Sequence, residues 1–121
     1  MEYKINDCSL DAVAFISFAN AVWKGDYDVK RTEQALSKTL NITAYDENRL
    51  VGCLRILTDG YYFGTITELL VLPQYQKQGI GSKLLQLEKN TRPPFYILAR
   101  SREWKRFTKR MAAKKVYSLI S

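Results

Sequence analysis

Apolar and polar residues follow one another along the chain in patterns that predict both strands and helices. The clearest pattern starts at residues 66–72, an apolar run rich in Leu, Ile, Val and Thr that predicts a buried strand. Pro73 ends this strand because proline has no N–H to donate to a sheet. A helix is expected to begin at Gly79 or Ile80 and to continue to about residue 90. Its apolar residues recur at three- and four-residue spacing, mostly on one face: Ile80, Leu84, Leu85 and Leu87.

The first forty residues predict a short strand at 3–5 and two helices. The first helix follows the possible capping residues Asn6, Asp7 and Ser9 and extends to about Trp23. Its expected buried face consists of Leu10, Val13, Ala14, Phe18, Ala21 and Val22. The second helix is expected over residues 29–40, with Leu36 and Leu40 facing inward.

The remaining segments complete an alternating order of strands and helices. Strands are expected at 41–45 and 50–58, joined by a polar turn at 46–49, and Asp59-Gly60 predicts a second turn. A strand at 95–99 should lie parallel to 66–72 through a right-handed crossover. Ser101 can cap a last helix, with Trp104, Phe107 and Met111 on one face, and residues 115–120 suggest a closing strand. Residues 1–121 are expected to form one domain.

The composition excludes some catalytic mechanisms and argues against a metal site. The chain has 121 residues, a net charge of +7, two cysteines and no histidine. Without histidine, a Ser-His-Asp or Cys-His nucleophile system is excluded, and a metal site is not expected. Cys8 and Cys53 are expected to be free thiols. No apolar run is long enough to span a membrane and the N-terminus lacks a signal-peptide pattern, so a cytoplasmic protein is expected.

The segment between the strand and the helix, residues 76–82, has the character of an anion site. Two glycines allow unusual backbone angles, and the start of a helix presents N–H groups that have no partner within the helix. These donors and the helix dipole suit a phosphate. The order Gly81-Ser82-Lys83 does not fit a Walker A loop, and Leu84 stands where the dinucleotide fingerprint needs a third glycine. A glycine-rich turn without a ligand is the alternative.

Residues 71–85 resemble motif A of the GNAT superfamily, the acyl-coenzyme A dependent N-acyltransferases. That motif is Gln/Arg-x-x-Gly-x-Gly/Ala, following a strand that ends in apolar-x-Pro-x-Tyr. Here it stands as VLPQY at 71–75 followed by QKQGIG at 76–81 and SKLL at 82–85. The order of the other elements also resembles the GNAT fold. The resemblance implies an α/β (α+β) fold: a mixed, mostly antiparallel central sheet with flanking helices, in which a parallel strand pair splays apart around the acyl thioester.

The same resemblance implies a cofactor and an activity: acetyl transfer from acetyl-CoA to a primary amine of a small molecule or a protein. The backbone of Leu70, Val71 and Leu72 would pair with the pantetheine arm. The pyrophosphate would be held at the turn by Gln76, Lys77, Gln78, Gly79, Ile80, Gly81 and Ser82. For Lys77 and Lys83, a purely solvated role is the alternative.

Candidate acid–base groups are fewer. Glu68 lies in the apolar motif strand, where burial favours the neutral form of a carboxyl, and is the candidate base. Its alternative is a carboxylate neutralised by a nearby Lys or Arg. The last helix lacks the tyrosine and the Gly-Phe turn that GNAT enzymes often carry, so Tyr117, Tyr96 or solvent would protonate the leaving thiolate.

Other functions stay open at this stage. The missing tyrosine also fits a non-catalytic, CoA-binding GNAT-like domain. The positive charge and the basic, aromatic stretch at 100–110 allow nucleic-acid binding, but the spacing there favours an amphipathic helix. The aromatic residues 61–63 fit core or edge packing, or a wall of an acceptor pocket. A homodimer is possible, and the sequence does not identify the acceptor.

Overall fold

The computed structural model describes residues 1–93 and 96–99. One five-stranded sheet in the order β1-β2-β3-β4-β5 forms its centre. Neighbouring strands are antiparallel except β4 and β5, which are parallel, as the sequence predicts. The elements are β1 (Glu2–Lys4), α1 (Ala12–Val22), α2 (Val29–Ser37), β2 (Leu40–Asp46), β3 (Arg49–Thr58), β4 (Phe63–Val71), a 3₁₀ turn (Pro73–Tyr75), α3 (Ile80–Thr91) and β5 (Ile97–Ala99).

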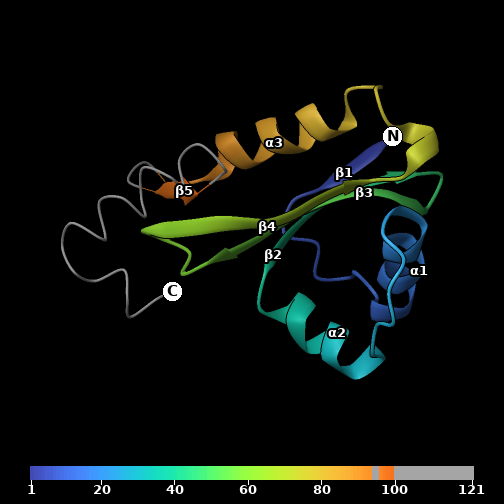
Figure 1. Ribbon diagram of the computed structural model, residues 1–121. Coiled ribbons are helices and arrows are strands. Elements are labelled where there is room, and N and C mark those ends of the chain that lie inside the picture. The colour runs from blue at the N-terminus through green and yellow to red at the C-terminus, as the bar shows by residue number, and fades with distance from the viewer. Residues whose placement is uncertain (94–95, 100–121) are drawn as a thin grey trace.

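The helices cover the two faces of the sheet unequally. Figure 1 shows α3 along one face and α1 with α2 on the other. On the α3 side, Ile80 and Leu84 pack over Gly52, where a Cβ would come within 3.0 Å of Ile80 Cγ2. Among the described residues the core is contributed mainly by α1, β2, β3 and the start of α3. This two-sided arrangement agrees with the predicted fold class.

Helix α1 is capped by Asp11, whose Oδ2 accepts from the Ala14 amide at 2.9 Å, two residues after Ser9, the last of the predicted caps. The predicted buried face is wrong for Val13, which is 60% exposed, and for Ala14 and Ala21. Phe18 is buried as predicted, and Ala12, Phe15 and Ala19 are buried in place of the residues that are wrong. The helix is apolar on nearly every side, so spacing alone does not select a face. The large rings of Phe15 and Phe18, with centroids 6.0 Å apart, select it by their burial.

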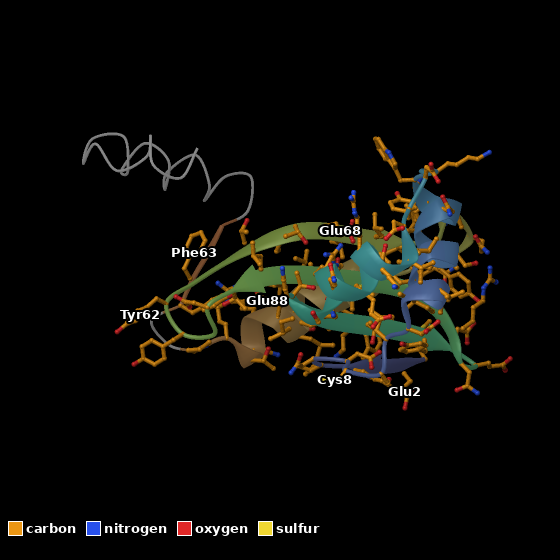
Figure 2. All side chains as sticks on the ribbon, turned by 90° about the horizontal axis from the view of Figure 1, so that it is seen from below. Glu2, Cys8, Tyr62, Phe63, Glu68 and Glu88 are labelled. Atoms are coloured by element: carbon orange, nitrogen blue, oxygen red, sulfur yellow. The ribbon has the colours of Figure 1, made fainter. Side chains whose placement is uncertain are left out.

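The turns match the sequence patterns. Glu47 and Asn48 both have positive φ, as a two-residue hairpin turn with the twist of its strands requires. Asp59 Oδ1 accepts from the amides of residues 61–63 at 2.8–3.2 Å and closes the β3–β4 turn. Tyr61 and Tyr62 are both exposed, so core packing is wrong for them, and their rings meet edge to face instead. Tyr62 is labelled at this tip in Figure 2.

A buried carboxylate connects the β1–α1 segment to the sheet. Asp7 accepts from Ser9, from Thr43 Oγ1 at 2.9 Å and from the Tyr45 hydroxyl at 2.6 Å. Burial opposes ionisation of Asp7, but these hydrogen bonds outweigh it and lower its pKa. For Tyr45, burial and the neighbouring Asp7 carboxylate both raise the pKa.

The state of the two cysteines and the character of the helices can also be compared with the sequence predictions. Cys8 and Cys53 are both free, as expected. None of the helices in residues 1–93 and 96–99 has the length and apolar character needed to cross a bilayer. The predicted last helix, the closing strand and the basic stretch at 100–110 lie outside the described residues.

Candidate active site

The turn between β4 and α3 exposes a row of main-chain donors. Helix α3 has Gly79 as its N-cap, with φ of 85°, a left-handed conformation that glycine adopts readily. The Lys83 amide donates to the Gly79 carbonyl at 3.0 Å, so the helix ladder starts there. Within the described part of the chain, no hydrogen bond is made by the four amides of residues 79–82. No acidic side chain stands in the first turn of α3 to compete for them.

The rest of the turn is fixed by its own contacts. The Tyr75 hydroxyl donates to Asp46 Oδ2 at 2.7 Å, which ties the turn to the β2–β3 hairpin and raises the tyrosine pKa. Gln76 Nε2 donates to the Val71 carbonyl at 3.0 Å, and the Gln76 amide donates to Pro73. The Gln76 amide is therefore already engaged. Lys77 has a positive φ of 62°, so the backbone is unusual on both sides of Gln78.

Strand β4 has an open edge beside this turn. Within the described residues it pairs with β5 over three positions, from Phe63↔Ile97 to Thr65↔Ala99. Beyond Thr65, no described strand pairs with that edge of β4, as a splayed parallel pair requires. Gly81 lies against this segment, since a Cβ on it would be 3.9 Å from Leu69 and 4.0 Å from Val71. The free amides and the open strand edge are thus adjacent.

The pairing of β4 with β3 decides which backbone groups face the open edge. The Leu72 amide donates to the Val51 carbonyl at 2.9 Å, so Leu72 is a hydrogen-bonded partner of β3. Because such pairs alternate along antiparallel strands, Leu70 also bonds towards β3, while the N–H and C=O of Leu69 and Val71 point to the open edge. Of the predicted trio Leu70, Val71 and Leu72, Val71 therefore has its backbone at the open edge, and Leu69 was missed by the sequence argument.

A bulge in β4 sets the position of Glu68. Ile66 pairs with Ile56 and Glu68 with Arg55, which leaves Thr67 as an extra residue on β4. The bulge directs Glu68 to the α1–α2 face, where it is labelled in Figure 2. Its Oε1 accepts from Arg55 Nη1 at 2.7 Å, and its side chain is 30% exposed. This is the neutralising Arg partner that the sequence leaves open.

Of the two tyrosines named as candidate acids, Tyr96 lies within the described residues and Tyr117 does not. Tyr96 lies on the α3 face, because its hydroxyl occupies the space that a Cβ on Gly64 would need. There it lines a cavity of about 160 Å³ with Thr58, Glu88 and Arg92, and burial raises its pKa. The structure does not bring Tyr96 and Glu68 together, since they lie on opposite faces. Tyr117 lies outside the described residues.

Sequence reasoning also missed a buried carboxyl on α3. Glu88 is 2% exposed and forms an ion pair with Arg92 Nη2 at 2.9 Å. Its position four residues after the buried Leu84 was the available signal. Among the described residues, no group of three possible ligands is arranged to hold a metal ion.

Comparisons with known proteins agree with this geometry. Residues 38–118 match the family described as the acetyltransferase (GNAT) domain. A GNAT-family acetyltransferase from Streptococcus pneumoniae TIGR4 superposes with a TM-score of 0.65 and 28% identity, covering 83% of this chain and 75% of that one. A probable acetyltransferase from meticillin-resistant Staphylococcus aureus gives 0.66 and 22%, covering 89% and 87%.

A third solved structure was determined with a ligand. An aminoglycoside 6′-N-acetyltransferase complexed with coenzyme A gives a TM-score of 0.62 and 21% identity, covering 74% of this chain and 54% of that one. No protein of curated function matches the sequence. The family match spans more than half of the chain, and the sheet, the turn and the open strand edge agree with it. The chain belongs to the GNAT acetyltransferase family.

Proposed function

We propose that this protein transfers an acetyl group from acetyl-CoA to a primary amine of a small molecule or a protein. The observation that carries the proposal is the row of four amides at residues 79–82 that have no partner among the described residues, beside an edge of β4 that no described strand covers. The amides, the helix dipole and the nearby Lys77 and Lys83 suit the pyrophosphate of the coenzyme. The coenzyme A bound to the aminoglycoside acetyltransferase supports the same class of cofactor.

The open strand edge suits the rest of the coenzyme. The pantetheine arm contains amide groups that can add to an exposed strand edge, as peptides do. The carbonyl and N–H groups of Val71 and Leu69 would meet it there. In this structure Gln76 Nε2 donates a hydrogen bond to the Val71 carbonyl. When the pantetheine arm binds, it would replace this hydrogen bond or share the carbonyl with Gln76. A main-chain N–H at this edge would polarise the thioester oxygen.

The reaction would proceed by direct attack. A neutral amine nitrogen attacks the thioester carbonyl carbon, so that a C–N bond forms and the C–S bond breaks. The proton lost by the nitrogen passes to Glu68, directly or through water, and the coenzyme leaves as a thiolate. Tyr117 or solvent would protonate that thiolate, whose thiol pKa of about 8.5 makes it a moderate base. The structure gives Glu68 an Arg55 partner on Oε1 and a side chain that is 30% exposed, so an amine or a water molecule can reach its other oxygen, Oε2.

Thermal unfolding with two ligands tests the cofactor. Acetyl-CoA is compared with 3′-phospho-ADP, the part of the coenzyme that lacks the pantetheine arm. Both should raise the melting temperature, and acetyl-CoA should raise it further. At about one hundred times the Kd, the gain is roughly 2.7 kcal/mol. Absence of any shift, or a soaked crystal with this turn empty, would contradict the proposal.

A thiol-release assay over a panel of amines tests the reaction itself. Release of free coenzyme that depends on the amine supports acetyl transfer. Tight acetyl-CoA binding with no amine-dependent release would support a coenzyme-binding domain without catalysis instead. Glu68→Gln separates the two cases, because it should slow release by about a hundredfold if Glu68 is the base and change nothing if no reaction occurs.

A further inference from the structure

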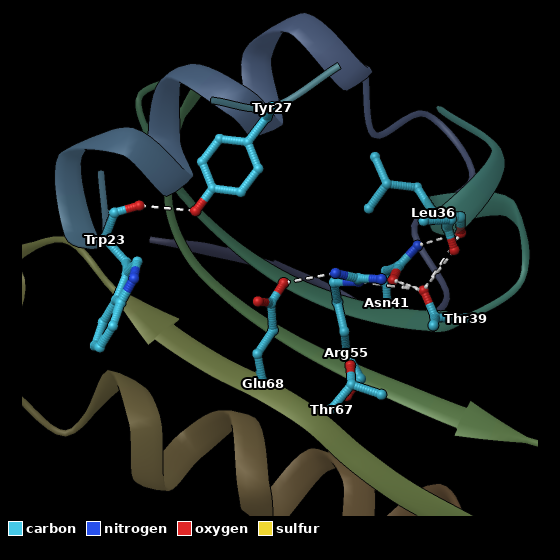
Figure 3. A network of polar contacts seen from close by, with 9 residues as sticks. Trp23, Tyr27, Leu36, Thr39, Asn41, Arg55, Thr67 and Glu68 are labelled. Atoms are coloured by element: carbon cyan, nitrogen blue, oxygen red, sulfur yellow. Dashed lines mark hydrogen bonds and ion pairs between the residues drawn. The ribbon is translucent and has the colours of Figure 1, made fainter. Parts of the chain in front are cut away.

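A chain of polar contacts crosses the α1–α2 face and ends at Glu68 (Figure 3). It begins at the Leu36 carbonyl near the end of α2, which accepts from Asn41 Nδ2 at 3.0 Å. Asn41 Oδ1 accepts from the Thr39 hydroxyl at 2.7 Å, and Thr39 Oγ1 accepts from Arg55 Nε at 3.4 Å. Arg55 Nη1 then donates to Glu68 Oε1 at 2.7 Å. The chain links α2, β2, β3 and β4.

The direction of each hydrogen bond along this chain is determined. The Arg55 Nε can only donate, so Thr39 must accept from it and must use its single proton elsewhere. Asn41 Oδ1, at 2.7 Å, is the nearest acceptor for that proton, since the Ala35 and Leu36 carbonyls are both 3.5 Å away, and Asn41 presents its amide group to the Leu36 carbonyl. Asn41 is only 4% exposed, so water cannot readily replace these partners.

Arg55 is also confined by its surroundings. It is the cross-strand partner of Glu68 in the β3–β4 register, and its side chain is 16% exposed. Its guanidinium lies over the Phe15 ring, 5.5 Å from the centroid. A planar cation held by an aromatic ring, a hydroxyl and a carboxylate has little freedom to rotate. Among the described residues, only Oε1 of Glu68 is bonded, and Oε2 accepts no hydrogen bond.

The geometry points to Arg55 as a positioning residue for Glu68, with Thr39 fixing Arg55 in turn. Arg55 Nη1 holds one carboxylate oxygen and leaves the other, Oε2, to receive the proton of the acceptor amine. This inference rests on the proposed function, in which Glu68 is the base. The alternative is an Arg55–Glu68 ion pair that only stabilises the pairing of β3 with β4. Such a pair would need the two opposite charges but not the contacts of Arg55 with Thr39 and Phe15.

Kinetics of a double-mutant cycle test the inference. Arg55→Lys keeps the positive charge but not the planar fork, and should lower kcat about tenfold while leaving KM for acetyl-CoA unchanged. Because Arg55 acts only through Glu68, the double variant with Glu68→Gln should be no slower than Glu68→Gln alone. Losses that multiply in the double variant, or full activity of Arg55→Lys, would overturn the inference. Thermal unfolding of each variant identifies any that fails to fold.

A second measurement does not depend on turnover. In protein labelled with carboxyl-¹³C glutamate, the Glu68 resonance is assigned by its loss in Glu68→Gln. Thr39 has no hydrogen bond to Glu68 and reaches it only through Arg55. Thr39→Val should therefore shift the Glu68 resonance, while Thr32→Val on α2 should not. An unchanged resonance in Thr39→Val would overturn the role of Thr39. A wild-type protein that binds acetyl-CoA but acetylates no amine would refute the proposed function, and this resonance would still decide whether the chain positions Glu68.

Discussion

Ile66 and Glu68 lie two residues apart on β4 but point to opposite faces of the sheet. Their partners on β3, Ile56 and Arg55, are adjacent residues and so face opposite ways, and Thr67 is the extra residue between the two pairs. Thr67 also bonds to β3, since its hydroxyl donates to the Arg55 carbonyl at 3.2 Å. A bulge bends and twists its strand, and this one lies two residues beyond Thr65, the last β4 residue that pairs with the described part of β5. The bulge therefore accounts for the orientation of Glu68, and it bends β4 close to the point where its pairing with the described part of β5 ends.

Deleting Thr67 tests this explanation. The deletion would leave every β3–β4 pair on both sides in register, so the protein should still unfold cooperatively. Without the bulge, β4 would straighten towards β5, and stabilisation by acetyl-CoA should be lost. Thr67→Val is the control, because it removes only the hydroxyl bond, should cost about 1 kcal/mol and should keep the ligand effect. Normal stabilisation of the deletion variant by acetyl-CoA would show that the bulge is not needed.

Gly79 offers a matched test of the proposed anion site. Gly79 and Gly60 have nearly the same φ, 85° and 84°, and a Cβ on either would meet no atom within 4 Å. Alanine should therefore cost each a similar 1–2 kcal/mol of backbone strain. Only Gly79→Ala should weaken the binding of acetyl-CoA, because it alters the turn that presents the free amides. Isothermal titration calorimetry measures this difference, and equal affinities of the two variants would argue against an amide cradle at Gly79.

The lowered pKa of Asp7 predicts that the folded protein loses stability in acid. Its pKa is lowered in the folded protein from an ordinary value of 3.8, so its contribution is complete above that value and is lost as the pH falls through the lowered pKa. Urea unfolding between pH 7 and pH 2 should show this decline. Asp7→Asn should cost about 2–3 kcal/mol at pH 7, since its amide cannot accept all of the bonds from Ser9, Thr43 and Tyr45.

The control for this experiment is Asp26→Asn, which changes an exposed carboxylate in the α1–α2 loop. It should keep both the stability and the pH dependence of the wild type. If Asp7→Asn had the same pH profile as the wild type, the carboxylate would not be the source of the acid sensitivity.

The two thiols should react very differently. Cys53 is fully buried, and burial raises its pKa to about 12, whereas Cys8 is exposed. Because the thiolate is the reactive form, iodoacetamide at pH 8 should label Cys8 and spare Cys53 in the folded protein. Mass spectrometry of the native and urea-unfolded protein measures this. Equal labelling of both thiols without urea would mean that β3 opens readily.

Local features were predictable because they depend on neighbouring residues. The strand, the proline stop, the glycine turn and the start of α3 at Ile80 follow from side chains within twenty positions of one another. The turn at 46–49 was predicted for the same reason. In α1, where apolar residues surround the whole helix, local spacing could not select the buried face. Trp23, which is 75% exposed, shows that apolar character alone does not imply burial.

The sequence by itself therefore determined the GNAT-like order of elements as far as β5 and the glycine-rich turn for which anion binding is proposed, because each depends on short-range spacing and backbone chemistry. Only the tertiary structure decided that Glu68 pairs with Arg55, that Leu69 joins Val71 at the open edge, and that Tyr96 lies on the opposite face. These relationships depend on how separate strands pair with one another, which the spacing of residues within one strand does not record, even where the strands are consecutive as β3 and β4 are. A single bulged residue changes that register, and no periodicity along one strand reveals it.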